Sequence, residues 1–178
     1  MNGTEIDLEE MLAFRENRVS LQQKMIKDWQ MPVISFSMNI PGPIKTNKQI
    51  RRAFSLGRQE LFDKLGQSHL KTGYAVEIHE NCGDELLVSV RGSAEEIKDI
   101  TVQIEESSPL GRLYDMDVIN TDGTKLSRPV YRKCLICEKQ AQECARSRTH
   151  TVAELQGAVD KLLRDYLPIP QSKQGDEK

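Results

Sequence analysis

The 178-residue sequence has few aromatic residues, no basic excess and no long apolar segment, and each of these absences argues against a class of protein. Aromatic residues make up only 5% of the chain. The expected strands also show no alternation of aromatic and basic residues, which argues against a sheet that stacks RNA bases. Lysine and arginine (25) do not outnumber aspartate and glutamate (27), so the basic excess typical of nucleic-acid binders is missing. No segment approaches the roughly 18 consecutive apolar residues expected of a membrane-spanning helix.

The N-terminal segment and the cysteine content set the expected compartment. Residues 1–14 lack a basic stretch followed by an apolar one, which is the pattern of a secretory signal. We therefore expect a cytoplasmic protein. There, four cysteines favour reduced thiols, metal ligands or a reactive centre over disulfides. The length and the ordinary globular composition predict a single domain over residues 1–170, followed by a disordered tail at 171–178.

Four segments show the signals of helices: an N-cap residue three positions before glutamate or glutamine, then apolar residues near every 3.6 positions. Gly57, on the apolar face of the second segment, costs about 1 kcal/mol relative to alanine, so we expect another backbone or a ligand close to it. In the first segment the expected apolar stripe is Leu8, Met11, Leu12, Val19, Met25, Ile26 and Trp29. The predicted helices are 7–29 (capping pair Asp7 and Glu10), 46–65 (Thr46 and Gln49), 93–106 (Ser93 and Glu96) and 149–167 (Thr151 and Glu154).

Strand patterns occur at 31–40, 74–80, 85–92 and 113–119. A Pro-Gly-Pro sequence ends the first strand, and a polar Asn-Cys-Gly-Asp loop joins the next two as a hairpin. The order of elements predicts an α+β fold with a ferredoxin-like βαββαβ antiparallel sheet and two helices on one face. An N-terminal helix and a C-terminal cysteine-rich helical segment are added to this unit, and the terminal helices are expected to cover the other face of the sheet.

The sequence GRLYDMDV at residues 111–118 places two carboxylates close together. Residues i and i+2 of a strand point to the same face, roughly 7 Å apart. Asp115 and Asp117 should therefore project together, while Met116 and Val118 face the core. Mg²⁺ is commonly held by one or two carboxylates and by phosphate oxygens of a substrate, as in phosphoryl-transfer enzymes. The alternative is a solvated strand face, because the D-x-D pattern is common by chance.

Basic residues near this pair favour a phosphate-binding interpretation. Arg112 directly precedes the two aspartates, Lys45 follows the first strand, and Arg51 and Arg52 begin the next helix. These groups converge if the first and last strands lie near one another. Taken singly, each arginine is more typical of a solvated helix face.

Three cysteines and a histidine lie in one short segment with the spacing Cys134-x2-Cys137-x6-Cys144-x5-His150. If residues 136–147 are helical, Cys137 and Cys144 lie two turns apart on one face. Cys134 and His150 can then complete a tetrahedral Cys₃His zinc site. The spacing is not that of a common zinc finger, and small buried side chains packing a short helix are the alternative. Cys82, His69 and His79 are assigned no role.

Four segments together resemble one known family, the apo-citrate lyase phosphoribosyl-dephospho-CoA transferases, also called citrate lyase holo-[acyl-carrier protein] synthases. The resemblance extends from about residue 31 to about residue 165 and rests on the combination, since each piece alone is weak. The segments are MNIPGPIK (38–45), RRAF (51–54) with Gly57, PLGRLYDMDV (109–118) and CLICEKQAQECARSRTH (134–150).

The resemblance implies a nucleotidyltransferase-type reaction. The donor would be 2′-(5″-triphosphoribosyl)-3′-dephospho-CoA, and the acceptor a serine hydroxyl of the citrate lyase acyl-carrier (gamma) subunit. The serine oxygen would attack the α-phosphate and pyrophosphate would leave. Asp115 and Asp117 would be the catalytic pair that holds Mg²⁺, and one of them could also accept the serine proton. The phosphates would be bound by Lys45, Arg52 and Arg112.

A non-catalytic adaptor is the alternative of a different class. It would use a ferredoxin-like domain with a Cys/His zinc knuckle to bind another protein. Asp115 and Asp117 discriminate between the two functions. An adaptor should tolerate their change to asparagine, whereas a transferase should lose turnover by orders of magnitude while it keeps its fold.

Overall fold

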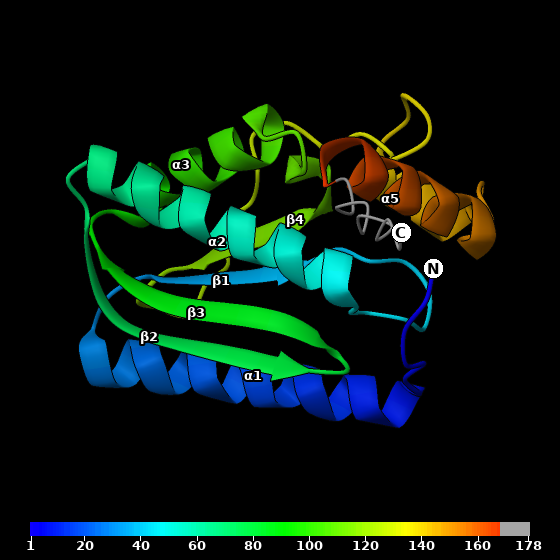
Figure 1. The fold of residues 1–178 in the computed structure, drawn as a ribbon. Coiled ribbons are helices and arrows are strands. Elements are labelled where there is room, and N and C mark those ends of the chain that lie inside the picture. Colours follow the sequence, from blue (N-terminus) through cyan, green and yellow to red (C-terminus); the bar gives the residue numbers. More distant parts are fainter. Residues whose placement is uncertain (168–178) are drawn as a thin grey trace, which may run out of the picture.

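A computed structural model of the chain describes residues 1–167, which form helices packed on a four-stranded antiparallel sheet (Figure 1). The predicted α+β class is therefore confirmed. The predicted tail at 171–178 and the domain boundary at 170 lie outside the described residues. The elements are α1 (Leu8–Trp29), β1 (Val33–Met38), α2 (Lys48–Gln67), β2 (Lys71–Glu80), β3 (Gly83–Arg91), α3 (Ala94–Ser107), a 3₁₀ turn (Gly111–Leu113), β4 (Tyr114–Ile119), α4 (Ala141–Ser147) and α5 (Val152–Tyr166).

The strand order in the sheet is β2-β3-β1-β4, and each neighbouring pair is antiparallel. The first and last strands are therefore direct neighbours, as the sequence argument for converging basic and acidic groups required. In this register Ser37 of β1 lies opposite Asp115 of β4, and Ser35 lies opposite Asp117. β4 is an edge strand, so the backbone groups on its outer side have no strand partner.

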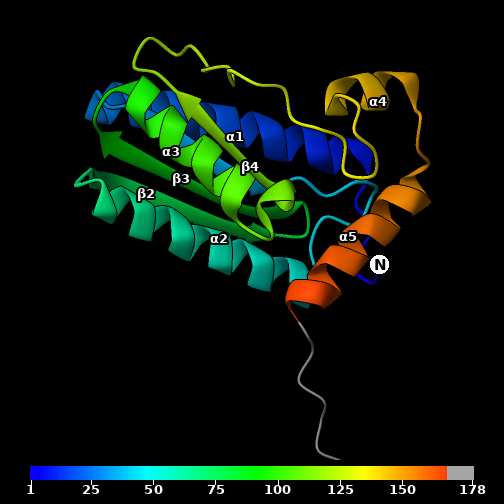
Figure 2. The same cartoon turned by 90° about the horizontal axis from the view of Figure 1, so that it is seen from above.

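The two faces of the sheet are covered by different helices. α2 and α3 lie on one face and α1 lies on the other (Figures 1 and 2). Apolar side chains such as Ile34, Phe36 and Met116 point toward α2 and α3 and form the main core. A smaller cluster on the opposite face packs Met25 and Ile26 of α1 against the sheet. α5 does not cover this second face as expected. It packs against α2 at the end of the sheet where α4 also lies (Figure 2).

The N-terminus of α2 differs from the sequence prediction. Asn47 is the N-cap, because its side-chain oxygen accepts hydrogen bonds from the N–H groups of Gln49 and Ile50. The predicted Thr46 and Gln49 capping box is therefore wrong. Thr46 is buried instead, and its hydroxyl donates to the carboxylate of Asp84 on β3 (3.1 Å).

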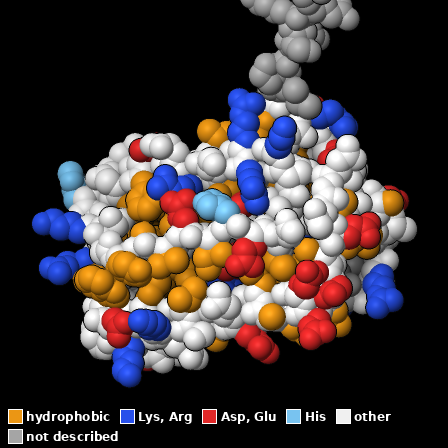
Figure 3. Space-filling view, turned by 60° about the horizontal axis from the view of Figure 1, so that its bottom comes forward, with side chains coloured by type: hydrophobic (Ala, Val, Ile, Leu, Met, Phe, Trp, Pro, Cys, Tyr) orange, Lys and Arg blue, Asp and Glu red, His pale blue; other side chains and the backbone are white. Residues whose placement is uncertain are grey.

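The apolar stripe predicted for α1 is only partly buried. Met25 and Ile26 contact the sheet, and Phe14, which the stripe omitted, is buried as well. Leu8, Leu12 and Val19 remain exposed because α1 also presents polar side chains to the sheet. Arg18 and Gln22, for example, contact the hydroxyls of Ser37 and Ser35. Figure 3 views the molecule from the side of α1 and shows apolar side chains gathered in a band between charged ones.

Gly57 of α2 lies in a closely packed part of the core. A Cβ atom on Gly57 would lie 2.7 Å from the ring of Phe36 and 2.8 Å from that of Tyr114. The glycine thus makes room for two aromatic rings, and not for the backbone or ligand that we predicted.

The hairpin between β2 and β3 is tighter than predicted, since only Asn81 and Cys82 separate the strands and Gly83 has φ +136°. Among residues 1–167, no helix is long and apolar enough to span a membrane.

Candidate active site and Cys-His cluster

Asp115 and Asp117 lie on the same face of β4, as the alternation of the strand requires. Both side chains are partly buried, whereas Met116 and Val118 between and beyond them are fully buried on the opposite face. The pairing with Ser35 and Ser37 puts the two carboxylates on the α1 side of the sheet.

Both aspartates line a cavity of about 570 Å³ that we call the aspartate cavity. Lys125 lies on the segment that turns back after β4, and its ammonium group is 2.5 Å from the Asp117 carboxylate. The cavity wall also contains Lys98 of α3 and two arginines of the following segment, Arg128 and Arg132. Glu105 lines the cavity as well, so three acidic and four basic side chains surround one space that is large enough for a small ligand.

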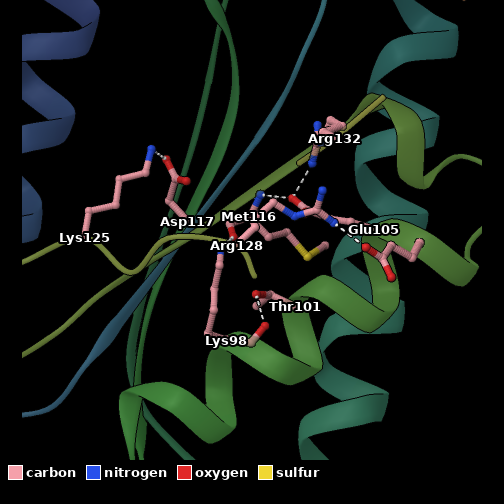
Figure 4. Close-up of polar contacts among 9 residues, drawn as sticks. Lys98, Thr101, Glu105, Met116, Asp117, Lys125, Arg128 and Arg132 are labelled. Atoms are coloured by element: carbon pink, nitrogen blue, oxygen red, sulfur yellow. Dashed lines mark hydrogen bonds and ion pairs between the residues drawn. The ribbon is translucent and has the colours of Figure 1, made fainter. Parts of the chain in front are cut away.

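Glu105 of α3 connects this wall to β4 (Figure 4). One carboxylate oxygen accepts the N–H of Met116 (2.7 Å) and pairs with Arg132 (2.7 Å), while the other lies 3.3 Å from Arg128. Lys98 donates to the carbonyl of Met116 (3.1 Å). The two α3 side chains thus satisfy the outer backbone groups of edge strand β4 at the residue between the two aspartates. They also hold the arginine-bearing segment beside it.

The electrostatics of the cavity favour an added positive charge near the aspartates. Burial raises the pKa of Asp115, and the neighbouring charge of Asp117 raises it further. Burial also lowers the pKa of Lys98, although Glu105 opposes this shift. A cation between the carboxylates would relieve their repulsion, and oxygen ligands of this kind suit Mg²⁺.

The three predicted phosphate-binding residues lie in different places. Lys45 lines a second cavity that also contains Asp115, and its ammonium group donates to the carbonyl of Ile40 (2.8 Å). Arg112 donates to the carbonyls of Lys133 and Cys134 and lines a third cavity. Arg52 lies on the exposed side of α2, in the helical layer on the other face of the sheet, and is not among the residues that line these cavities.

Sequence reasoning missed several polar residues of the site. Lys98 and Glu105 lie on an amphipathic helix, where charged residues are normally solvated, and nothing in the sequence shows that they turn toward β4. Glu85 lines the second cavity with Lys45 and Asp115, lies near the start of the apolar strand β3 and is 2% exposed. A charged residue in such a strand was the only available signal. Arg128 and Arg132 belong to a basic segment whose position depends on the fold.

Cys134, Cys137, Cys144 and His150 converge in one cluster, which we call the Cys-His cluster. One ligand atom from each of these residues lies within 4.8 Å of all the others. The sulfur atoms of Cys137 and Cys144 are 3.5 Å apart, and Nε2 of His150 is 3.3 Å from the sulfur of Cys137. Three thiols and one imidazole are a donor set that fits a tetrahedral metal site.

The local structure of the cluster differs from the prediction. Helix α4 covers only Ala141–Ser147, so Cys137 lies in the preceding loop and does not share a helical face with Cys144. The condition of a helix over the whole of 136–147 is therefore not met, and only its second half is helical. A turn forms in its place, in which the N–H of Cys134 donates to the carbonyl of Lys139 (2.7 Å). The turn brings the cysteines together by folding the loop back on itself.

The third cavity, of about 750 Å³, lies beside the cluster and adjoins the aspartate cavity. Asn39, Arg132 and two alanines of α4, Ala141 and Ala145, line both cavities. Cys134 and Cys144 contribute to its wall, together with apolar side chains such as Leu155. The cluster thus holds the segment that separates the two spaces.

A pair of carboxylates among basic side chains, next to a large and partly apolar cavity, forms a set of groups suited to a phosphorylated substrate and its cation. Comparison with known proteins agrees with this class. Over residues 6–166 the chain matches the family described as apo-citrate lyase phosphoribosyl-dephospho-CoA transferase. Relatives with that name from Escherichia coli O6:K15:H31 (strain 536 / UPEC) and Shigella boydii serotype 18 (strain CDC 3083-94 / BS512) are each 34% identical over 164 residues, which is 90% of this chain and 90% of theirs.

The chain therefore belongs to the apo-citrate lyase phosphoribosyl-dephospho-CoA transferase family. The resemblance drawn from the four sequence segments is confirmed. The match begins at residue 6 and so includes α1, for which the sequence segments gave little family signal. Membership of a transferase family favours the enzyme over the non-catalytic adaptor.

Proposed function

We propose that the chain attaches the phosphoribosyl-dephospho-CoA group to a serine of the citrate lyase acyl-carrier (gamma) subunit. The donor is 2′-(5″-triphosphoribosyl)-3′-dephospho-CoA and the second product is pyrophosphate. The names of the relatives support the transferred group and the acceptor enzyme. The observation that carries the location of the site is that Asp115 and Asp117 line one cavity with four basic side chains.

The aspartate cavity accepts the triphosphate in this proposal. Asp115 and Asp117 hold Mg²⁺, which when bound neutralises phosphate charge and orients the oxygens. Lys125, Arg128 and Arg132 supply positive charge to the leaving pyrophosphate, a role in which arginine forks suit phosphate geometry. The serine oxygen forms a bond to the α-phosphorus, and the bond from that phosphorus to pyrophosphate breaks.

The structure supports the three phosphate contacts expected from the sequence to different degrees. Lys45 remains a proposed contact, because it shares a cavity with Asp115. Arg112 lines the adjoining cavity, where it would meet the dephospho-CoA part of the donor. Arg52 has less support as a contact, since α2 lies on the other face of the sheet. Lys125, Arg128 and Arg132 are better situated for this role.

We infer that the Cys-His cluster binds Zn²⁺ in a structural role. Four protein ligands fill a tetrahedral zinc site and leave no open position for catalysis. The close approach of the four donor atoms supports this inference. Transfer to a serine requires no thiol of the enzyme, which agrees with a structural role.

We infer further that the sheet with α2 and α3 is a ferredoxin-like unit within a single transferase domain. The strand order β2-β3-β1-β4 and the two helices on one face support the first part. A single core that includes residues from Ile34 to Leu167 supports the second. The cytoplasmic location stays a prediction from the sequence.

Mass spectrometry of the acceptor tests this function. Purified protein, apo acyl-carrier subunit, the triphosphoribosyl donor and Mg²⁺ are mixed, and the carrier should gain the mass of one phosphoribosyl-dephospho-CoA group. Asp115→Asn and Asp117→Asn should each lower the rate by orders of magnitude with an unchanged circular dichroism spectrum. Asp99→Asn, an exposed aspartate of α3, is the matched control and should react normally. An unmodified carrier with the unaltered enzyme contradicts the proposal.

A further inference from the structure

Glu85 of β3 is a buried carboxylate to which the proposed chemistry gives no role. Its side chain is 3% exposed, and one oxygen pairs with Arg18 of α1 at 2.9 Å. The other oxygen, Oε2, is buried and has no hydrogen-bond partner among the described residues. A buried carboxylate oxygen without a protein donor costs free energy, so a protein that keeps one calls for an explanation.

Glu85 borders a small cavity next to the aspartates. This cavity, of about 130 Å³, is lined by Glu85, Ser37, Lys45 and Asp115 among others, and we call it the glutamate cavity. Ser37 of β1 pairs with Glu85 on one side and with Asp115 on the other. The three residues therefore form a row across three strands on one face. Two strand spacings separate the outer backbones by roughly 10 Å, and both outer side chains project from the same side.

Asp115 lies between two spaces, because it lines both the glutamate cavity and the aspartate cavity. In a phosphoryl transfer the attacking and leaving oxygens lie roughly in line, on opposite sides of the phosphorus. If the triphosphate occupies the aspartate cavity, the α-phosphorus lies near Asp115 and pyrophosphate leaves on the side of Lys125 and Arg128. The opposite side, from which the acceptor hydroxyl must come, is the glutamate cavity.

We propose that Glu85 is the general base that accepts the proton of the acceptor serine. The inference rests on the proposed function and names a catalytic residue for it. The serine Oγ–H proton moves to the carboxylate of Glu85, while an oxygen electron pair forms the bond to the α-phosphorus. The bond to pyrophosphate breaks, and its electrons leave with pyrophosphate. Release of the proton to water returns Glu85 to its starting state.

The electrostatic surroundings suit a base that works near neutral pH. Burial raises the pKa of Glu85 to about 7, and the charge of Glu80 on β2 adds to the rise. Arg18 opposes the shift. A base with a pKa near the working pH is efficient, because it is deprotonated often enough and still basic enough to take a proton. The other charged groups lining the glutamate cavity are Arg15 of α1, Lys45 of the loop after β1, Asp84 of β3 and Asp115 of β4.

A pH profile of single-turnover transfer tests this role. In the unaltered enzyme the rate should fall as the pH drops below about 7, because Glu85 becomes protonated. Glu85→Gln should lower the rate at pH 8 by roughly 10²–10⁴-fold and remove this acid limb from the profile. Glu16→Gln, the same change at an exposed position of α1, is the matched control and should leave rate and profile unchanged.

Two further measurements separate this role from a structural one. Donor binding in the presence of Mg²⁺, followed by calorimetry, should be unchanged in Glu85→Gln, since the carboxylate faces the acceptor side. Arg18→Gln keeps Glu85 but removes the charge that lowers its pKa, so the acid limb should move to higher pH. This second variant carries the test if Glu85→Gln does not fold.

The outcomes are distinguishable from failure of the proposed function. No transfer by the unaltered enzyme contradicts the function itself. Normal transfer by both the unaltered enzyme and Glu85→Gln, with the same acid limb, overturns the role of Glu85 alone. An acid limb that Arg18→Gln leaves in place also overturns it.

Discussion

Glu105 shows how a single residue of the aspartate cavity can organise the wall around it. It is 4% exposed and lies against Arg128, Arg132 and the N–H of Met116. Strand β4 and the segment that carries the two arginines therefore depend on one carboxylate. Because two arginines share it, its loss removes the ion pair of Arg132 and leaves Arg128 with its pair to the exposed Glu106.

Glu105→Gln should destabilise the protein by roughly 3 kcal/mol, since breaking a buried ion pair leaves an uncompensated charge. The glutamine side chain can still accept the N–H of Met116, so the lost stability measures the ion pairs with the two arginines. Glu106→Gln is the matched control, because Glu106 is 58% exposed and pairs with Arg128 at 3.1 Å. That exposed pair should contribute less than about 1 kcal/mol. Urea unfolding of both variants measures the difference, and equal effects would contradict the prediction.

The raised pKa of Glu85 also predicts how the free energy of unfolding changes with pH. Its pKa of about 7 in the folded protein lies above the ordinary value of 4.5 for a glutamate, so ionisation is harder in the folded state. This residue's contribution is therefore fully present below pH 4.5 and is lost as the pH rises through 7. The loss is on the order of 3 kcal/mol. Between pH 4.5 and 8, Glu85→Gln should lose less stability than the unaltered protein in urea unfolding. Parallel curves for the two proteins would contradict the prediction.

At the scale of elements, the sequence predicted which segments form helices and strands because periodicity and caps are local. Asp7 and Thr151 cap their helices with the predicted glutamate partners. The errors arise where a tertiary contact decides. Thr46 turns to the buried Asp84, so the cap passes to Asn47.

The candidate site shows the same division between local and tertiary information. The common face of Asp115 and Asp117 follows from strand geometry alone. Lys98, Glu105 and Glu85 could not be predicted, since their roles depend on which helix face and which strand lie next to β4.

The N-cap of α2 can be tested directly. Asn47→Ala removes the acceptor for the N–H groups of Gln49 and Ile50 and should cost about 1 kcal/mol. Asn47→Ser keeps a capping oxygen and should cost much less. Thermal unfolding compares the two variants. If alanine and serine are equally tolerated, Asn47 does not stabilise this helix through its side chain.

At the scale of the molecule, the sheet and its helices form a support, and residues 120–151 form one wall of the site. The regular element within this wall is the short helix α4. The segment after β4 bridges back at Lys125, Glu105 holds Arg128 and Arg132, and Arg112 holds the carbonyls of the turn before Cys137. The Cys-His cluster links the loop at Cys134 and Cys137 to α4 and His150 within the wall. Metal binding should therefore stabilise the wall more than the sheet, because the core does not depend on it.

Metal removal tests this division. The purified protein should contain one zinc ion per chain, and a chelator should release it. Trypsin should then cut first at basic residues of the wall such as Lys139, Arg146 and Arg148, while the sheet resists. Cys137→Ser should show the same cleavage without a chelator, and adding Zn²⁺ to the chelated protein should restore protection. Cys82→Ser, outside the cluster, is the control and should keep both the metal and the resistance. Identical cleavage of Cys137→Ser and the unaltered protein would show that the cluster does not hold the wall.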